Sequence, residues 1–193
     1  MVCDIISVMN NSLPKILYHG SEIKITDGFI RMKPGYINNM KTPIIAAFAT
    51  SDFVRARLYA IMRLVATGYK SPVKNNELYV ECLKQNVPEK AYVYELDSVG
   101  FKHDIEDEYY SLTDVKIKNV ITIDIMQEIK DKNIKIYVLK DKTVFANMSR
   151  KQSDILWDKL IQQQDKFELY KPDFEKLDMA ILGKILKDGS KAL

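Results

Sequence analysis

Hydrophobic positions in the first half of the chain fall into short runs separated by polar and turn-forming stretches. The runs at residues 15–18 (KILY) and 44–49 (IIAAFA) are too short and too continuous for surface helices, so we predict a strand at each. Apolar residues recur every three or four positions over residues 53–65, which predicts a helix with one buried face. The cluster at 50–52 (TSD) supplies candidate N-caps, and Gly68 is expected to end the helix.

Three neighbouring stretches lack this periodicity. Residues 22–43 contain several Gly, Pro and Asn residues, and we predict a long loop there, of the kind that often binds a ligand. Residues 70–76 (KSPVKNN) are predicted to form a turn. The Gly-Ser pair at 20–21 is predicted to stop the first strand.

From residue 78 to residue 139 the chain is rich in β-branched and aromatic residues. With the two earlier strands, this region gives seven strands and one central helix, which is an α+β domain with a mainly antiparallel core. The later strands are predicted at residues 78–83, 91–96, 108–117, 120–125 and 134–139, with one or two helical turns at 126–132.

The pattern changes after residue 140. Apolar residues at helical spacing over 149–166 and again over 172–187 predict two helices. Pro172 fits the first turn of the second helix, and Gly189 fits its end. We therefore predict a C-terminal helical hairpin packed on the β-rich domain.

Composition narrows the classes of function. The chain has 193 residues, of which 47% are hydrophobic and 28% are charged, so it can bury the core of a globular domain. Its 29 basic and 26 acidic residues give a net charge of +3, which is too even for a protein that coats nucleic acid. Two cysteines and two histidines exclude a disulfide scaffold and the four-thiolate and multi-histidine metal sites, so we predict no metal.

Neither a membrane span nor a secretory signal is predicted. No run approaches about 18 consecutive apolar residues, and the first residues lack the basic start of a signal peptide. We therefore expect a cytoplasmic protein with no membrane partner, and its two cysteines fit a reducing compartment. Cys82 and His103 are the residue types of a nucleophile and its base, but nothing in their sequence contexts favours that pairing.

Three short motifs place polar and aromatic residues at the ends of predicted elements. Residues 18–21 (YHGS) end the first strand, residues 48–50 (FAT) end the second, Tyr59 follows in the helix, and Glu108 opens a later strand. This combination resembles the ADP-ribosyltransferase superfamily, in the branch with a His–Tyr–Glu active site that includes diphtheria-type toxins and poly-ADP-ribose polymerases. The family's first strand carries a Tyr-His-Gly-Thr/Ser motif, which residues 18–21 match.

The resemblance implies a fold as well as an activity. The fold is a split antiparallel β core with a central helix, here a catalytic domain over residues 1–140. Residues 141–193 would be a C-terminal helical extension without a named counterpart in the family. The sequence departs from the family pattern at Phe48, where a tyrosine is usual, because phenylalanine can stack but cannot donate a hydrogen bond.

The resemblance assigns NAD as the substrate and gives four residues a role in breaking its nicotinamide–ribose bond. His19 would donate to a ribose hydroxyl, Gly20 would let its backbone approach the carboxamide, and Tyr59 would stack on the nicotinamide. Glu108 would stabilise the positive charge that develops on the ribose as the glycosidic bond breaks. His19, Tyr59 and Glu108 are therefore the predicted catalytic residues, and we expect them to line one cleft.

Further residues are predicted to contact NAD around this centre. Ser21, Phe48 and Thr50 belong to the matching motifs. Arg31 in the long loop is expected to meet the pyrophosphate, whose oxygens suit a guanidinium fork; the alternative is an ordinary surface charge. Glu106 forms a Glu-x-Glu pair with the catalytic glutamate, an arrangement that arginine-modifying relatives use to orient an acceptor. In an acidic loop that pair can equally be a coincidence.

The predicted activity is transfer of ADP-ribose from NAD to a protein or nucleic-acid acceptor, with release of nicotinamide. The alternatives are an NAD glycohydrolase, removal of a 2′-phosphate from RNA, or an inactive ADP-ribosyltransferase fold that serves as a binding module. The near-neutral charge argues against removal of a 2′-phosphate from RNA, and it does not support a nucleic-acid partner. Acceptor choice would lie in the loops at 22–43 and 98–107, and the sequence does not identify the acceptor.

Overall fold

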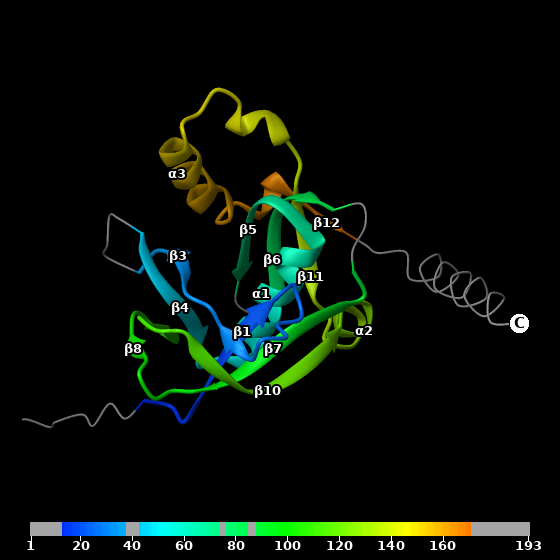
Figure 1. The fold of residues 1–193 in the computed structure, drawn as a ribbon. Helices are drawn as coiled ribbons and strands as arrows, with labels where there is room; N and C mark the ends of the chain where they lie inside the picture. Colours follow the sequence, from blue (N-terminus) through cyan, green and yellow to red (C-terminus); the bar gives the residue numbers. More distant parts are fainter. Residues whose placement is uncertain (1–12, 38–42, 74–75, 85–87, 171–193) are drawn as a thin grey trace, which may run out of the picture.

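The computed structural model describes residues 13–37, 43–73, 76–84 and 88–170, and within them the chain is α+β with mainly antiparallel sheets (Figure 1). The larger sheet has eight strands, in the order β2-β10-β7-β1-β4-β9-β8, and β3 adds to β4. Every pair in it is antiparallel. Its strands are β1 (Ile16–Ser21), β2 (Phe29–Ile30), β3 (Lys33–Gly35), β4 (Ile44–Thr50), β7 (Lys90–Asp97), β8 (Lys102–His103), β9 (Glu108–Ser111) and β10 (Val115–Asp124).

The smaller sheet has four strands in the order β12-β11-β6-β5. The β6–β11 pair is parallel, and the two outer pairs are antiparallel. Its strands are β5 (Ala66–Val73), β6 (Glu77–Leu83), β11 (Lys135–Leu139) and β12 (Phe167–Tyr170).

Helix α1 (Phe53–Val65) connects the two sheets along the chain and packs between them. The side chain of Asp52 accepts from the backbone N–H of Val54 and so caps the first turn. Ala56, Ile61 and most other apolar residues of α1 are buried in one cluster with residues of β6, β7 and β11. Because this buried face fixes the rotation of the helix, its remaining face is directed toward β1 and β4, where the candidate site lies.

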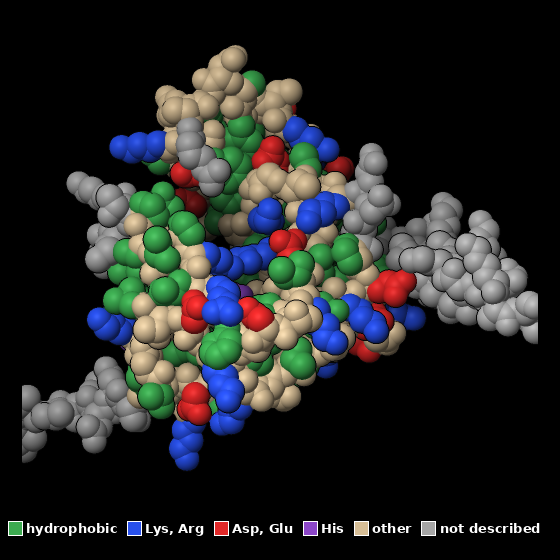
Figure 2. All heavy atoms as spheres, viewed as in Figure 1, with side chains coloured by type: hydrophobic (Ala, Val, Ile, Leu, Met, Phe, Trp, Pro, Cys, Tyr) green, Lys and Arg blue, Asp and Glu red, His purple; other side chains and the backbone are tan. Residues whose placement is uncertain are grey.

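Two further helices pack on the sheets, and the first of them adds Ile125 and Ile129 to this core. Helix α2 (Ile125–Asp131) follows β10, and helix α3 (Arg150–Leu160) belongs to a lobe that precedes β12 (Figure 1). Trp157 of α3 is buried against the smaller sheet, and its indole N–H donates to the Ser71 hydroxyl at 2.8 Å. Figure 2 shows a hollow between this lobe and the β3–β4 hairpin, with Lys and Arg side chains beside it. Among the described residues no helix is long and apolar enough to cross a membrane.

The structure confirms the α+β class and most predicted elements, and it corrects others. The predicted loop at 22–43 contains the short strands β2 and β3. Gly68 does not end a helix: α1 stops at Val65, and β5 occupies residues 66–73, which include the first four residues of the turn predicted at 70–76. The Gly-Ser pair at 20–21 is part of β1, and the strand ends at Ser21, where the sequence predicted its stop.

Two later segments also differ from the prediction. The strand predicted at 108–117 is two strands, β9 and β10, because the chain turns at 112–114, where the Ser111 hydroxyl accepts from the N–H of Thr113. After α3 the chain forms β12, which pairs with β11, so part of the C-terminal extension completes the smaller sheet. The second helix of the predicted hairpin, at 172–187, lies outside the described residues.

Candidate active site

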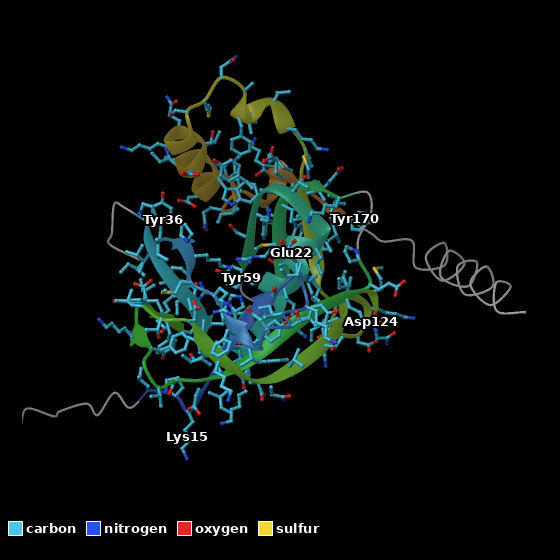
Figure 3. The ribbon with its side chains drawn as sticks, viewed as in Figure 1. Lys15, Glu22, Tyr36, Tyr59, Asp124 and Tyr170 are labelled. Atoms are coloured by element: carbon cyan, nitrogen blue, oxygen red, sulfur yellow. The ribbon has the colours of Figure 1, made fainter. Side chains whose placement is uncertain are left out.

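A cavity of about 240 Å³ lies where β1, β3, β4, α1 and the start of β9 meet. His19, Tyr59 and Glu108, which are up to 89 residues apart in sequence (108 − 19), all line it. Figure 3 places Tyr59 near the centre of the molecule and Tyr36 on the side of the β3–β4 hairpin. The structure therefore brings the three predicted catalytic residues together around one space.

His19 is fixed by β1 and is almost fully buried. Its Nδ1 lies 2.7 Å from the backbone carbonyl oxygen of Phe48 on β4. A carbonyl only accepts, so Nδ1 carries the proton. Burial lowers the pKa of His19 to about 4, against the opposing effect of this hydrogen bond, and the positive charges of Lys33 and Arg63 lower it further. The ring is therefore neutral at pH 7.

This protonation state corrects the predicted role of the histidine. With Nδ1 donating to Phe48, the Nε2 atom of the neutral ring carries no proton. His19 can therefore accept a hydrogen bond from a ligand hydroxyl through Nε2. The sequence prediction assumed that His19 donates this hydrogen bond, which the neutral ring cannot do. A sugar hydroxyl both donates and accepts, so the ring still suits a ribose.

Glu108 opens β9 and pairs with Thr50 of β4 in the sheet register. Its Oε1 accepts two hydrogen bonds, at 2.8 Å from the Arg55 guanidinium and at 3.3 Å from the Tyr59 hydroxyl. Burial raises the pKa of Tyr59, and the charge of Glu108 raises it further, so the phenol is protonated and donates. Both donors bind one oxygen, and no hydrogen bond or ion pair from the described residues reaches Oε2, so that oxygen can meet a ligand.

Arg55 also binds the two carboxylates that precede Glu108. Its guanidinium contacts Glu106 at 3.3 Å and makes a short contact with Asp107. Asp107 in turn accepts from the Thr50 hydroxyl at 2.7 Å. One positive charge shared among three carboxylates leaves this side of the cavity net negative, and it fixes the loop that leads into β9.

Lys33 and Arg63 add positive charge to the same cavity. Sequence reasoning missed both, as it missed Arg55. One signal was available: Arg55, Tyr59 and Arg63 are spaced four apart, so a helix places them on one face. Lys33 gave no such signal, because its strand has three residues and lies in a stretch without periodicity.

Two residues that were predicted to contact NAD, Arg31 and Ser21, do not line the cavity. Arg31 does not line the cavity, because it forms ion pairs with Asp27 at 2.8 Å and Asp114 at 2.6 Å on the surface. The Ser21 hydroxyl bonds to the backbone of Ile23, and Ser21 does not line the cavity either.

Gly20 and Thr50 do line the cavity, with constraints that the prediction did not foresee. A Cβ on Gly20 would lie 2.0 Å from the carbonyl oxygen of Ala56, so the glycine is required by the contact between β1 and α1. The Thr50 hydroxyl donates to Asp107 and accepts from the N–H of Asp52, so it is already engaged in the loop and the helix cap.

The fold does not bring Cys82 and His103 together as a nucleophile and its base. Cys82 lies on β6 in the smaller sheet, whereas His103 lies on β8 in the larger one, with its Nε2 at 2.7 Å from the Glu106 carbonyl oxygen. Within the described ranges, no group of three or more His, Cys, Asp or Glu side chains is placed to hold a metal ion.

Comparison with models of known protein families, with curated proteins and with solved structures finds no match to this chain. The assignment of a function therefore depends on the geometry of the cavity and on the motifs that form it.

Proposed function

We propose that this protein breaks the nicotinamide–ribose bond of NAD and transfers the ADP-ribose to an acceptor, as an ADP-ribosyltransferase does. The observation that carries the proposal is the convergence of His19, Tyr59 and Glu108 on one cavity. These residues come from β1, α1 and β9, and each of them belongs to a sequence motif that resembles the family. The same motifs imply an ADP-ribosyltransferase-like arrangement of the antiparallel core.

The electrostatics of the cavity suit this bond cleavage. Nicotinamide is cationic in NAD and leaves as a neutral molecule, so the reaction needs no proton donor at the leaving group. Positive charge moves to the ribose in the transition state, as in glycoside hydrolysis. Glu108 supplies a negative charge with Oε2 available, while Arg55 and Tyr59 hold Oε1 in place. A preorganised charge of this kind stabilises the transition state more than the bound substrate.

Aromatic side chains provide a place for the nicotinamide. Phe48 and Tyr59 both line the cavity, and a planar ring can stack on either. A Cβ on Gly35 would lie 2.4 Å from the Phe48 ring, so glycine at that position leaves room for the ring. His19 Nε2 can accept from a ribose hydroxyl on the same side of the cavity.

Incubation of the purified protein with NAD tests the proposal. We expect release of nicotinamide, measured by chromatography, with water or a macromolecule as the acceptor. In both cases the ribose carbon loses nicotinamide, gains the acceptor oxygen or nitrogen, and one proton is released. Free ADP-ribose in equal amount to nicotinamide would show a glycohydrolase, whereas a deficit that appears with cell lysate would show transfer.

Two outcomes would contradict the proposal. NAD binding without any nicotinamide release, in buffer or in lysate, would leave a binding module. No NAD binding at all would remove NAD as the ligand of the cavity. Isothermal calorimetry with NAD distinguishes these outcomes, because it detects binding without turnover.

A further inference from the structure

Lys33 and Arg63 line the cavity, and they differ from the neighbouring arginines of α1 because neither is joined to a carboxylate of the described residues. Arg55 and Arg57, on the same helix as Arg63, form ion pairs with Glu108 and Glu128. No ion pair in the described part of the chain involves Lys33 or Arg63, although both side chains line the cavity.

Two positive groups that converge on one partly enclosed space repel each other. Burial lowers the pKa of Lys33, and the charge of Arg63 lowers it further, while Glu22 acts in the opposite direction. Glu22 is itself ion-paired with Lys84 at 3.6 Å, so it does not neutralise the pair. The same two cations also lower the pKa of His19. An anion bound between Lys33 and Arg63 would remove this repulsion.

We infer that Lys33 and Arg63 form a phosphate subsite, and that it receives the diphosphate of the dinucleotide. The inference rests on the proposed function, and it replaces Arg31 as the expected partner of the diphosphate. A guanidinium can bind two phosphate oxygens as a fork, and an ammonium adds a compact positive charge. The two side chains are therefore a suitable pair for adjacent phosphate groups.

The position of Arg63 along α1 agrees with this assignment. Tyr59 hydrogen-bonds to Glu108 and so marks the level at which the glycosidic bond would lie. Arg63 follows one turn later, about 6 Å further along the helix axis at 1.5 Å per residue. That spacing is comparable to the length of the ribose unit that separates nicotinamide from the diphosphate. His19 lines the same cavity, where the ribose hydroxyls would be.

The affinities of two ligands test the subsite directly. ADP-ribose carries the diphosphate, and nicotinamide carries no phosphate. We expect Lys33→Gln and Arg63→Gln each to weaken ADP-ribose binding by about 10- to 100-fold in calorimetry, the usual effect of losing a hydrogen bond to a charged group. Nicotinamide affinity should stay within about twofold, and Arg63→Lys should recover part of the loss because it keeps the charge.

Arg31→Gln is the matched control, because Arg31 is an exposed arginine with two carboxylate partners outside the cavity. Its ADP-ribose affinity should equal that of the unmodified protein. Thermal unfolding of each variant checks that the fold is kept. Unchanged ADP-ribose affinity in both cavity variants would overturn the inference, and so would an equal loss of nicotinamide affinity.

A third result would assign the two cations to the acceptor instead. If ADP-ribose binding is unchanged but binding of a 5′-phosphorylated oligonucleotide is lost, the phosphate belongs to the acceptor and the diphosphate assignment is wrong. Failure of the proposed function is a separate outcome. A protein that binds ADP-ribose through Lys33 and Arg63 but releases no nicotinamide keeps the subsite and loses the reaction.

Discussion

Replacing Glu108 by glutamine removes the charge of the proposed catalytic residue and almost nothing else. The glutamine oxygen can still accept from Arg55 and Tyr59, which bind Oε1 at 2.8 and 3.3 Å in the native protein. Its amide nitrogen then takes the place of Oε2. The side chain keeps its volume and its anchoring bonds, so the variant should fold, and its effect on the reaction should report the lost charge alone.

The expected effect is large on kcat and small on KM. Loss of one preorganised stabilising group costs about 2.7–4 kcal/mol in the transition state, which is roughly a 10²- to 10³-fold fall in kcat. NAD should still bind, because His19, Tyr59 and the proposed phosphate subsite remain. Initial rates of nicotinamide release over a range of NAD concentrations separate the two constants. An unchanged KM with a depressed kcat is the signature of an interaction made mainly in the transition state.

Glu106→Gln provides the comparison for Glu108→Gln. The Glu106 side chain is 63% exposed and contacts Arg55 at 3.3 Å, so its loss should change kcat for NAD hydrolysis by less than about fivefold. Transfer to an acceptor would slow in this variant only if the Glu-x-Glu pair orients that acceptor. Full activity in Glu108→Gln, or equal loss in both variants, would refute the role that we give to Glu108.

Three further predictions concern residues around the cavity. Arg55→Gln should lower kcat about 10- to 100-fold, because Glu108 loses its charged anchor, while Arg31→Gln leaves kcat unchanged; steady-state rates of nicotinamide release decide this. Gly20→Ala should destabilise the fold by about 3 kcal/mol in urea unfolding, because its Cβ would lie 2.0 Å from the carbonyl oxygen of Ala56; a loss under about 0.5 kcal/mol would contradict that packing. His19 has its pKa lowered from 6.5 to about 4 in the fold, so only the unfolded state is protonated between these values. Stability present above pH 6.5 should therefore fall by about 3 kcal/mol as the pH drops to 4, and urea unfolding of His19→Gln should lack that part of the slope.

The parts of the fold that the sequence predicted correctly are those that burial dictates. The run at 44–49 becomes β4 because the strand lies inside the larger sheet, where Ala46, Ala47 and Ala49 are buried, although Ile45 in the same run is 62% exposed. The apolar stripe of α1 likewise follows from its buried face. Local pattern predicts such elements because the burial acts on their own side chains.

Strand β5 shows where this reasoning fails. It is an outer strand of the smaller sheet, held by its backbone hydrogen bonds to β6 rather than by an apolar run. Gly68 has a φ of 68° and lies where the register shifts between Thr67 and Lys70, so the glycine serves a β-bulge. In a single sequence, a glycine in a bulge cannot be distinguished from a glycine that ends a helix.

The residues of the candidate site also differ in whether the local sequence could indicate them. His19, Tyr59 and Glu108, which line one cavity, could be predicted to meet because short motifs surround each of them. Arg31 was assigned wrongly because one of its partners, Asp114, is 83 residues away, and local pattern does not show that an arginine is already paired. Lys33 was missed because its place in the cavity depends on how β3 pairs with β4.

The close contact of Gly20 with α1 also affects how fast the backbone amides on the two sides of the cavity exchange their hydrogens with solvent. Backbone amides of β1 and α1 should exchange with deuterium only when the whole domain unfolds, because the two elements share a buried interface without room for a Cβ. Glu108 lies instead on the four-residue strand β9, which pairs on one side with the two-residue strand β8 at the end of the sheet. Local opening there breaks few hydrogen bonds, so we expect fast exchange near Glu108. The side of the cavity that carries the carboxylate should thus open more often than the side formed by β1 and α1, within the limits that the ion pairs of Arg55 set.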